Sequence, residues 1–465
     1  MQPTRRFRFV RRAAPYLFIA LAVLAAPILV GAGGLAVARS SFSRDAQPPA
    51  VDQPLPALPT PDPAKRTAVV LSSAYGVELT DFLPPYEILA RSGAFDVFVV
   101  APERRLLPIV NANMTPVGLD FLPHYSFAEY ETAVGRAPDL LVIPYFPNYS
   151  PSRDAAIVEW AREHTAAHTT VLTICAGTET LVDTGLVTAG HTLTTNLGWF
   201  SRLEPRLPDV RWLRNVRYAD DGAFITSTNL TSGVDATLQA VDRLVDRATA
   251  ERVARELGYT ATHYLDDPSF EPRQALGYAA VAATVAFQPT WQRLGVVLYD
   301  GMSELALAGL VDPYTASYTA KVTTLAPERT IVTSRHGLSF VPRHDFQTAP
   351  QLDRVVLPGG VAAASLRRLA SEWAAGQRGV TIEEPHRPGD FPYDATLLEL
   401  ARLRGGDFAE GFAHVTLIPA AQLGLADPLG RLALLVRPLG LAALVLVALL
   451  WSRRRRSARL EPLPA

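Results

Sequence analysis

The chain has a single cysteine, Cys175, in 465 residues, and this scarcity excludes an internal disulfide and any cysteine-rich metal site. Its nine histidines show no ligand-like spacing, so neither a metal nor another cofactor is expected. A surplus of one charge is lacking as well, because 44 lysines and arginines face 45 acidic residues. This balance implies no broad attraction to nucleic acid, and no helix-turn-helix pattern is present. We therefore expect no nucleic-acid partner.

Long apolar runs lie near both ends. Residues 13–38 carry no charged residue, and residues 432–451 carry only Arg437. Each run reaches the roughly 20 residues that a helix needs to cross a bilayer. Arginine clusters outside both runs place the two termini in the cytoplasm by the positive-inside rule, with the central region outside. We therefore expect a protein of the cell membrane, although a cleaved signal peptide ending at Ala38 is an alternative for the first run.

Short apolar runs alternate with helical patterns after a proline-rich segment that is expected to be an extended tether. Residues 67–71, 95–100, 139–143 and 170–174 are typical of buried strands, and 154–165 and 179–186 of helices. Such alternation predicts an α/β fold with a doubly wound parallel sheet. An Ala-rich stretch at 275–287 is too short to span a membrane and predicts a buried helix or an inter-domain packing segment.

An internal repeat follows. Ala101-Pro-Glu-Arg104 recurs as Ala326-Pro-Glu-Arg329, and Leu119-Asp-Phe-Leu-Pro123 recurs as Leu338-Ser-Phe-Val-Pro342. These ordered matches predict a complete unit and a partial second copy. The copy has Ala306 in place of Asp81 and no cysteine after Gly359-Gly360, while its Glu304 is expected to be solvated or to cap a helix.

The predicted organisation along the chain is a basic cytoplasmic end at 1–12, a span at 13–38, a linker at 39–65, a complete unit at 66–265, a connecting helix at 266–291, a partial unit at 292–425, a span at 431–451 and a basic cytoplasmic tail at 452–465.

Chemistry is concentrated at two places in the complete unit. An apolar run ends in Cys175-Ala-Gly177 and continues into a helical pattern, which predicts a strand–turn–helix elbow at the carboxyl edge of the sheet. Asp81 follows the first strand in Gly76-Val-Glu-Leu-Thr-Asp81. A lone cysteine at such a turn favours a chemical role, so Cys175 and Asp81 are the candidate catalytic residues.

These motifs resemble the ThiJ/PfpI family of the class I glutamine amidotransferase-like superfamily, above all the amidase-type domains of AraC-type regulators and isonitrile hydratases. The similarity covers roughly residues 67–246. It implies a flavodoxin-like fold in which Cys175 is the nucleophile, with its pKa lowered by the helix amino terminus, and Asp81 is the acid/base group. The N–H groups of Ala176 and Tyr145 would form an oxyanion hole, and Gly177 and Asn196 would complete the pocket.

The sequence also departs from the family pattern. Tyr145-Phe146 stands where the family has Gly-Gly, which predicts a reshaped or closed oxyanion hole. Asn196 stands where many regulator-type members have a histidine, and His191 is expected on the surface. No cysteine–histidine pair follows from these motifs, so peptide hydrolysis is not expected.

Two functions therefore stay open beside a structural role in a membrane assembly. One is a membrane-anchored module that binds or senses a small molecule or an oxidant without strong catalysis. The other is a hydrolase, hydratase or lyase in which Cys175 attacks a small electrophile and Asp81 moves the proton. Because members of the family commonly dimerise near the elbow, we expect a homodimer or an internal pseudo-dimer formed with the partial copy.

Overall fold

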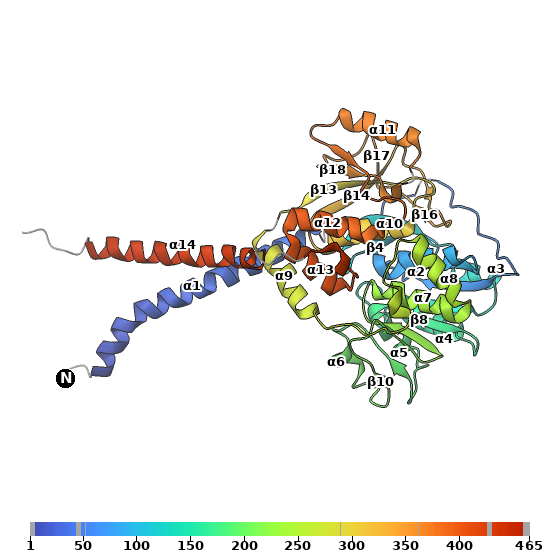
Figure 1. Ribbon diagram of the computed structural model, residues 1–465, viewed down its shortest axis with the longest axis horizontal. Helices are drawn as coiled ribbons and strands as arrows, with labels where there is room; N and C mark the ends of the chain where they lie inside the picture. The colour runs from blue at the N-terminus through green and yellow to red at the C-terminus, as the bar shows by residue number, and fades with distance from the viewer. Residues whose placement is uncertain are drawn as a thin grey trace, which may run out of the picture.

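The computed structural model describes residues 5–42, 48–51, 53–288, 290–360, 362–425 and 430–458. Two α/β units form one body, from which the long helices α1 (Arg5–Phe42) and α14 (Gly430–Ala458) leave on the same side (Figure 1). Residues 1–4 and 459–465 of the predicted basic ends lie outside the described part of the chain.

The first unit is built on a seven-stranded sheet in the order β11-β12-β8-β7-β1-β3-β6. All neighbouring strands are parallel except β11 and β12, so the predicted α/β fold with a parallel sheet is confirmed. The strands are β1 (Arg66–Leu71), β3 (Phe95–Ala101), β6 (Tyr125–Ser126), β7 (Leu140–Ile143), β8 (Thr170–Thr173), β11 (Tyr218–Asp220) and β12 (Phe224–Ser227). The helices are α2 (Leu79–Ser92), α3 (Phe127–Ala133), α4 (Ala155–Glu163), α5 (Thr178–Asp183), α6 (Phe200–Leu203), α7 (Ser232–Leu244) and α8 (Arg247–Glu256).

The second unit has a five-stranded parallel sheet in the order β17-β14-β13-β18-β19. Read from β19, this order repeats β8-β7-β1-β3-β6 of the first sheet. The strands are β13 (Gln292–Val297), β14 (Ala320–Ala326), β17 (His344–Asp345), β18 (Arg354–Val356) and β19 (Thr381–Glu383). The helices are α10 (Glu304–Ala316), α11 (Ala364–Ala375), α12 (Pro392–Arg404) and α13 (Gly406–Thr416).

A third sheet joins the units, in the order β15-β16-β5-β4-β2. Its strands are β2 (Val77–Glu78), β4 (Leu107–Val110) and β5 (Pro116–Leu122) from the first unit and β15 (Val332–Thr333) and β16 (Ser339–Phe340) from the second, while β9 (Thr192–Leu193) and β10 (Arg211–Trp212) form a separate pair. Phe121 and Phe340, which hold the same place in the sequence repeat, lie opposite each other in the antiparallel pairing of β5 and β16. Helices α2 and α10 also pack together. Two equivalent strands that pair antiparallel are related by a local twofold axis.

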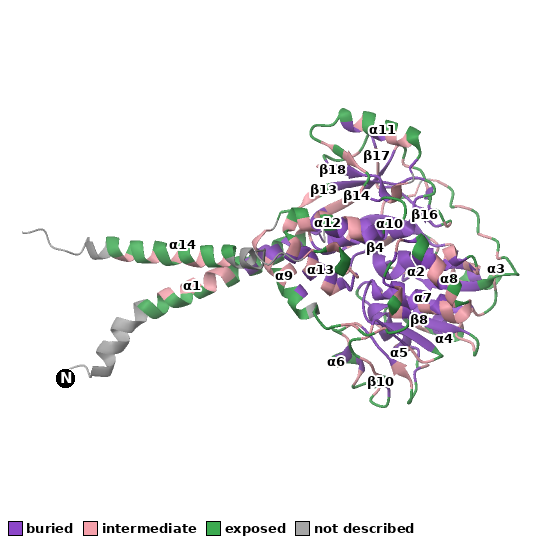
Figure 2. Ribbon diagram, in the orientation of Figure 1, coloured by how far each residue is buried: buried purple, intermediate pink, exposed green. Residues whose placement is uncertain are grey.

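The protruding helices are apolar and mainly exposed (Figure 2). Tyr16–Phe42 and Val436–Arg455 are long and apolar enough to cross a membrane, so both predicted spans are compatible with the structure. At its carboxyl end α1 meets the body, where Phe42 packs edge-on against Trp291 and Tyr318.

The two connecting segments differ from expectation only in part. The proline-rich linker is no free tether, because its Gln53 bonds with Arg329 and Ile331 and Pro59 accepts a hydrogen bond from Tyr125. The Ala-rich stretch forms α9 (Gln274–Phe287), but it is not buried, since Leu276 is 74% exposed. Instead α9 packs against α13 on one side and α1 on another, so the alternative of a packing segment holds.

Candidate functional site

Cys175 stands at the sharp elbow between β8 and α5. Its φ of 57° lies in the left-handed region, which a side chain other than glycine adopts only under constraint from its surroundings. Two positions on, Gly177 packs so closely that a Cβ would lie 2.2 Å from the carbonyl oxygen of Ile143. The elbow therefore needs glycine at 177, and the cysteine is held in one orientation.

Two asparagines surround the sulfur. Asn196 Nδ2 donates to Cys175 Sγ at 3.2 Å and also to Asn229 Oδ1 at 3.2 Å. The thiol in turn lies 3.9 Å from Asn229 Oδ1. Asn229 is fixed from the second unit, because its Nδ2 donates to the carbonyl of Val415 at the end of α13. The sequence identified Asn196, but nothing local marked Asn229.

Asp81 and Glu78 form a buried acidic pair at the start of α2. Asp81 Oδ2 accepts a hydrogen bond from the Tyr145 N–H at 3.1 Å, and the Asp81 N–H donates to the N-cap residue Glu78, whose Oε2 lies 2.7 Å away. The other oxygens, Asp81 Oδ1 and Glu78 Oε1, have no hydrogen-bond partner among the described residues. Sequence reasoning missed Glu78, although an acidic residue three positions before Asp81 is a helix-capping signal.

A third carboxyl reaches this pair from the second unit. Asp312 of α10 accepts a hydrogen bond from Thr80 Oγ1 at 2.9 Å, and burial raises its pKa to about 6. Burial also raises the pKa of Asp81, the Tyr145 N–H lowers it, and Asp312 raises it again, with a net increase. For Glu78, burial, Asp312 and Asp81 all raise the pKa. Asp81 therefore keeps its proton to a higher pH than an exposed aspartate does.

The thiol is neutral for the same reasons. Burial raises the pKa of Cys175, and the charges of Asp81 and Glu78 raise it further, while the Ala176 N–H and Asn196 lower it by less. The expectation that the helix amino terminus lowers this pKa is wrong, because α5 has only 6 residues and the side chain is 7% exposed. Asp81 is close enough to act on the thiol by its charge, but no hydrogen bond joins the two in the described structure.

Neither expected oxyanion donor is free. The Tyr145 N–H donates to Asp81, and the Ala176 N–H is directed at the sulfur of Cys175. The Tyr145 ring packs edge-on against Trp199 at 5.3 Å and lies near the thiol. His191 lies apart from this site, with its Nδ1 2.8 Å from Asp221. The arrangement is that of a closed pocket without an imidazole base.

Helix α13 reaches this site through Val415, whose carbonyl accepts from Asn229, and α9 packs against α13. Burial raises the pKa of Tyr278 on α9 and the charge of Cys175 raises it further, while the side chain is half exposed. A Cβ on Gly277 would lie 2.3 Å from the carbonyl oxygen of Gly411, so the backbones of α9 and α13 touch. Segments outside the first unit thus contribute to the surroundings of the site.

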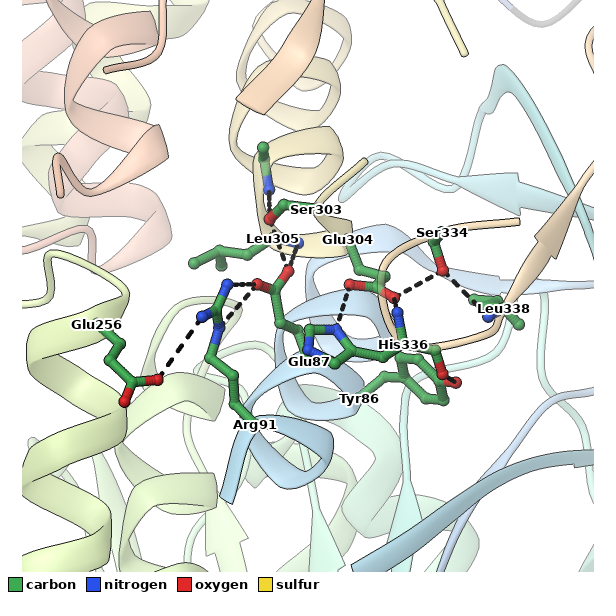
Figure 3. A network of polar contacts seen from close by, with 11 residues as sticks. Tyr86, Glu87, Arg91, Glu256, Ser303, Glu304, Leu305, Ser334, His336 and Leu338 are labelled. Carbon is green, nitrogen blue, oxygen red and sulfur yellow. Dashed lines mark hydrogen bonds and ion pairs between the residues drawn. The ribbon is translucent and has the colours of Figure 1, made fainter. Parts of the chain in front are cut away.

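A second polar cluster lies where α2 meets α10 (Figure 3). Glu87 accepts from Ser303 Oγ and Leu305 N, each at 2.7 Å, and from Arg91. Burial by itself raises the pKa of Glu87, but Arg91 and the bonds from Leu305 and Ser303 outweigh it and hold the pKa below its usual value. Glu87 thus caps α10 across the interface.

Glu304 belongs to the same cluster and is completely buried, so the expectation of a solvated or capping side chain is wrong. It accepts from His336 Nδ1 at 2.8 Å and from Ser334 Oγ at 2.6 Å. Glu87, Glu304 and His336 are close enough together for a metal ion, but Arg91 already supplies a cation there and the carboxylates are occupied by hydrogen bonds. Their contacts favour a structural clasp between the units.

Comparison with known proteins finds a family match in the first unit. Residues 66–243 match the model of the DJ-1/PfpI family. None of the proteins with curated functions matches the chain. The match ends before α9 and the second unit begin.

Several solved structures are similar to part of this chain. DJ-1beta of Drosophila melanogaster is 18% identical, with 42% of this chain and 97% of that chain covered and a TM-score of 0.34. Oxidised DJ-1 of Toxoplasma gondii is 17% identical, covering 42% and 99%, with a TM-score of 0.34. A THiJ/PfpI family protein of Pseudomonas syringae is 19% identical, covering 46% and 85%, with a TM-score of 0.35.

Proposed function

Because residues 66–243 of this chain are a DJ-1/PfpI family domain, we propose that the protein is a membrane-anchored binding or sensing module rather than an efficient enzyme. The observation that carries this proposal is the environment of Cys175, which is 7% exposed, has a pKa raised by burial and has no imidazole neighbour in the described structure. A nucleophilic cysteine needs the thiolate, and burial between carboxyls opposes its formation. We propose that the site binds a small molecule or an oxidant, and that Cys175 becomes accessible only when the segments packed over it move.

Membrane anchoring is part of the proposal. The two apolar helices leave the body on one side, and aromatic residues Phe42 and Trp291 gather with Lys321 where α1 enters it. Aromatic and basic side chains of this kind are typical of the membrane–water interface. With the arginine clusters in the cytoplasm, the two units face outward.

The second unit takes the place of a partner subunit in this proposal. The two helices make corresponding contacts at the interface: Glu87 accepts from the backbone N–H of Leu305 at the start of α10, and Asp312 accepts from the hydroxyl of Thr80 at the start of α2. Glu87 and Asp312 hold equivalent positions in the repeat, as do Thr80 and Leu305. Such correspondence is the mark of a twofold interface, here formed within one chain.

The decisive experiment measures the alkylation of Cys175 by iodoacetamide as a function of pH, on the full chain in detergent micelles. With one cysteine, the chain itself has a single reporter. We expect slow alkylation whose rate still rises at pH values where the urea-unfolded chain has levelled off. Asp81→Ala removes a charge that raises the pKa of the thiol, so this variant should react faster at a given pH. A wild-type rate that levels off below about pH 7.5 would instead reveal an activated thiolate and overturn the proposal.

One observation favours the second candidate, a cysteine-dependent hydrolase, hydratase or lyase. Cys175 keeps the left-handed φ of 57° that sets a nucleophile on an elbow, and Asp81 stands near it with a pKa that burial raises. In that reaction the sulfur attacks a small electrophile, and Asp81 passes the thiol proton to the atom that gains the electron pair. Turnover of small electrophiles that disappears in both Cys175→Ser and Asp81→Asn would establish it.

A further inference from the structure

A cavity of about 470 Å³ lies at the carboxyl edge of the first sheet, and no residue of the elbow Cys175–Gly177 lines it. Strands β1 and β7 are neighbours, but the chain continues from β1 to β3 on one side and from β7 to β8 on the other. Open α/β sheets bind ligands at such a switch point, where the loops after the two strands separate. Tyr75, after β1, and Asn148, after β7, both line the cavity. The same two loops carry Asp81 and Tyr145 of the cysteine site, but neither of these residues nor Cys175 lines the cavity.

The charge of the lining is of one sign. Arg39, Arg105 and Arg153 line the cavity, and no aspartate or glutamate in the described part of the chain does. Two nearby acids offset part of this charge: Asp154 pairs with Arg153 at 3.0 Å, and Glu103, whose side chain is 69% exposed, pairs with Arg105. A guanidinium has five N–H donors, so Arg105 and Arg153 keep further donors that these ion pairs do not use.

The arginines are held in place by the loops. Arg105 Nη2 donates to the carbonyl of Ala74 at 2.5 Å, and Arg153 Nη2 to that of Pro147 at 2.6 Å. The guanidinium of Arg153 lies 4.2 Å from the centre of the Tyr75 ring. Fixed, partly satisfied guanidinium groups lose little conformational entropy when they bind an oxyanion.

Backbone strain gathers around the same cavity. Among the described residues six that are not glycine have positive φ, and two of them, Met114 with 59° and Asn148 with 51°, line it. The hairpin that carries Met114 is fixed by Asn111, whose Oδ1 accepts from the N–H groups of Asn113 and Thr115. Strained backbone persists where the surroundings enforce it, which is common at ligand sites.

We propose that this cavity binds an anionic group with several acceptor oxygens, a phosphate or a carboxylate. Arginine recognises both through paired N–H donors. The group belongs either to a free anion or to a lipid headgroup, because Arg39 lies near the end of α1, at the boundary of the apolar segment Tyr16–Phe42. The proposal goes beyond the function assigned to Cys175 and does not depend on it.

The test uses the full chain in neutral detergent micelles and inorganic phosphate as the probe, followed by calorimetry. The double variant Arg105→Gln/Arg153→Gln is compared with Arg162→Gln, an exposed arginine of α4 that pairs with Glu159. We expect phosphate binding that weakens with added chloride, at least about tenfold weaker binding in the double variant, and unchanged binding in the control. Thermal melting of each variant shows that the fold persists.

A second arm replaces phosphate with mixed micelles containing a phosphatidylglycerol. Loss of binding in the double variant with this lipid, but no binding of free phosphate, would assign the site to headgroups and also support the proposal. Equal binding by wild type and double variant in both arms, or no binding of either probe by the wild type, would overturn it. Either failure leaves the alkylation behaviour of Cys175 untouched.

Discussion

The two units share a strand order and differ at one turn each. In the first unit the strand β7 runs into Pro144-Tyr145-Phe146, and in the second unit the equivalent strand β18 runs into Pro358-Gly359-Gly360. The unit with the cysteine thus lacks the glycine pair, and the unit with the glycine pair lacks the cysteine.

Both turns nevertheless satisfy their first N–H group in the same way. Tyr145 N donates to Asp81 Oδ2 at 3.1 Å, and Gly359 N donates to His386 Nδ1 at 3.0 Å. Burial lowers the pKa of His386 to about 4, so its ring is neutral and can accept this bond. In both units the backbone N–H that follows the proline is buried and needs a hydrogen-bond acceptor. A carboxylate supplies it in the first unit and a histidine ring in the second.

The largest effect is expected at the strand pair that joins the units. Phe121→Ala and Phe340→Ala each remove a completely buried ring and should each lower the free energy of unfolding by about 3–5 kcal/mol. Because the two residues lie opposite each other, the double variant should lose less than the sum. Urea unfolding followed by circular dichroism measures both, with the exposed Leu398→Ala as control. Separate transitions for the two units would show that they are stable independently.

A second test changes Asp312, the acidic residue of the second unit that lies beside Glu78 and Asp81. The folded-state pKa of Asp312 is about 6, above its usual value of 3.8, so its stabilising contribution is present below about pH 4 and is lost as the pH rises through 6. Asp312→Asn cannot ionise and should be more stable at pH 8 by up to about 3 kcal/mol. Melting temperatures at pH 4 and pH 8 should diverge for wild type and variant, while the exposed Asp209→Asn follows wild type. A variant destabilised at both pH values would contradict the assignment.

A third test gives the first unit the glycine of the second. Tyr145→Gly removes the ring that lies against Trp199 near the thiol, so iodoacetamide should react with Cys175 about tenfold faster at pH 8. The rate is read by mass spectrometry, with Cys175→Ser as the background. If the rate stays at the wild-type value, the Tyr145 ring does not limit the access of iodoacetamide to Cys175, and other segments of the chain do.

The smallest effect concerns the asparagine that donates to the sulfur. Asn196→Ala removes the 3.2 Å hydrogen bond that lowers the pKa of Cys175, so this pKa should rise further. One such bond is worth about 1 kcal/mol, which corresponds to about fivefold slower alkylation at a fixed pH. Gln239→Ala, on the helix α7, serves as a control. Faster alkylation would mean that Asn196 mainly shields the sulfur from the reagent.

The sequence was sufficient for features that local patterns encode. Apolar runs predicted β1, β3, β7 and β8, and the motif Cys175-Ala-Gly177 predicted the elbow, because strand burial and a tight turn restrict neighbouring residues directly. The order of repeated motifs predicted two successive units, and the sheets have matching strand orders.

The rest of the site depends on contacts between segments far apart in the chain. Asp312 reaches Glu78 and Asp81 across 200 or more residues, and Val415 fixes Asn229 in the same way. The hydrophobic periodicity of the sequence does not reveal contacts between such distant residues. The pKa of Cys175 was misjudged for this reason, since burial and neighbouring carboxyls decide it and only the fold brings them together.

Helix α9 connects the apolar helices to α13, whose Val415 holds Asn229 beside the thiol. Near one end of α9 the backbone of Gly277 touches that of Gly411 in α13, and near the other end a Cβ on Gly34 of α1 would stand 2.0 Å from the carbonyl oxygen of Ala286. Arg437 of α14 also donates to the carbonyl of Phe287. Backbones in such contact cannot slide past each other. In a bilayer, a change of thickness that tilts α1 would therefore move α9 as a lever and vary the exposure of the thiol.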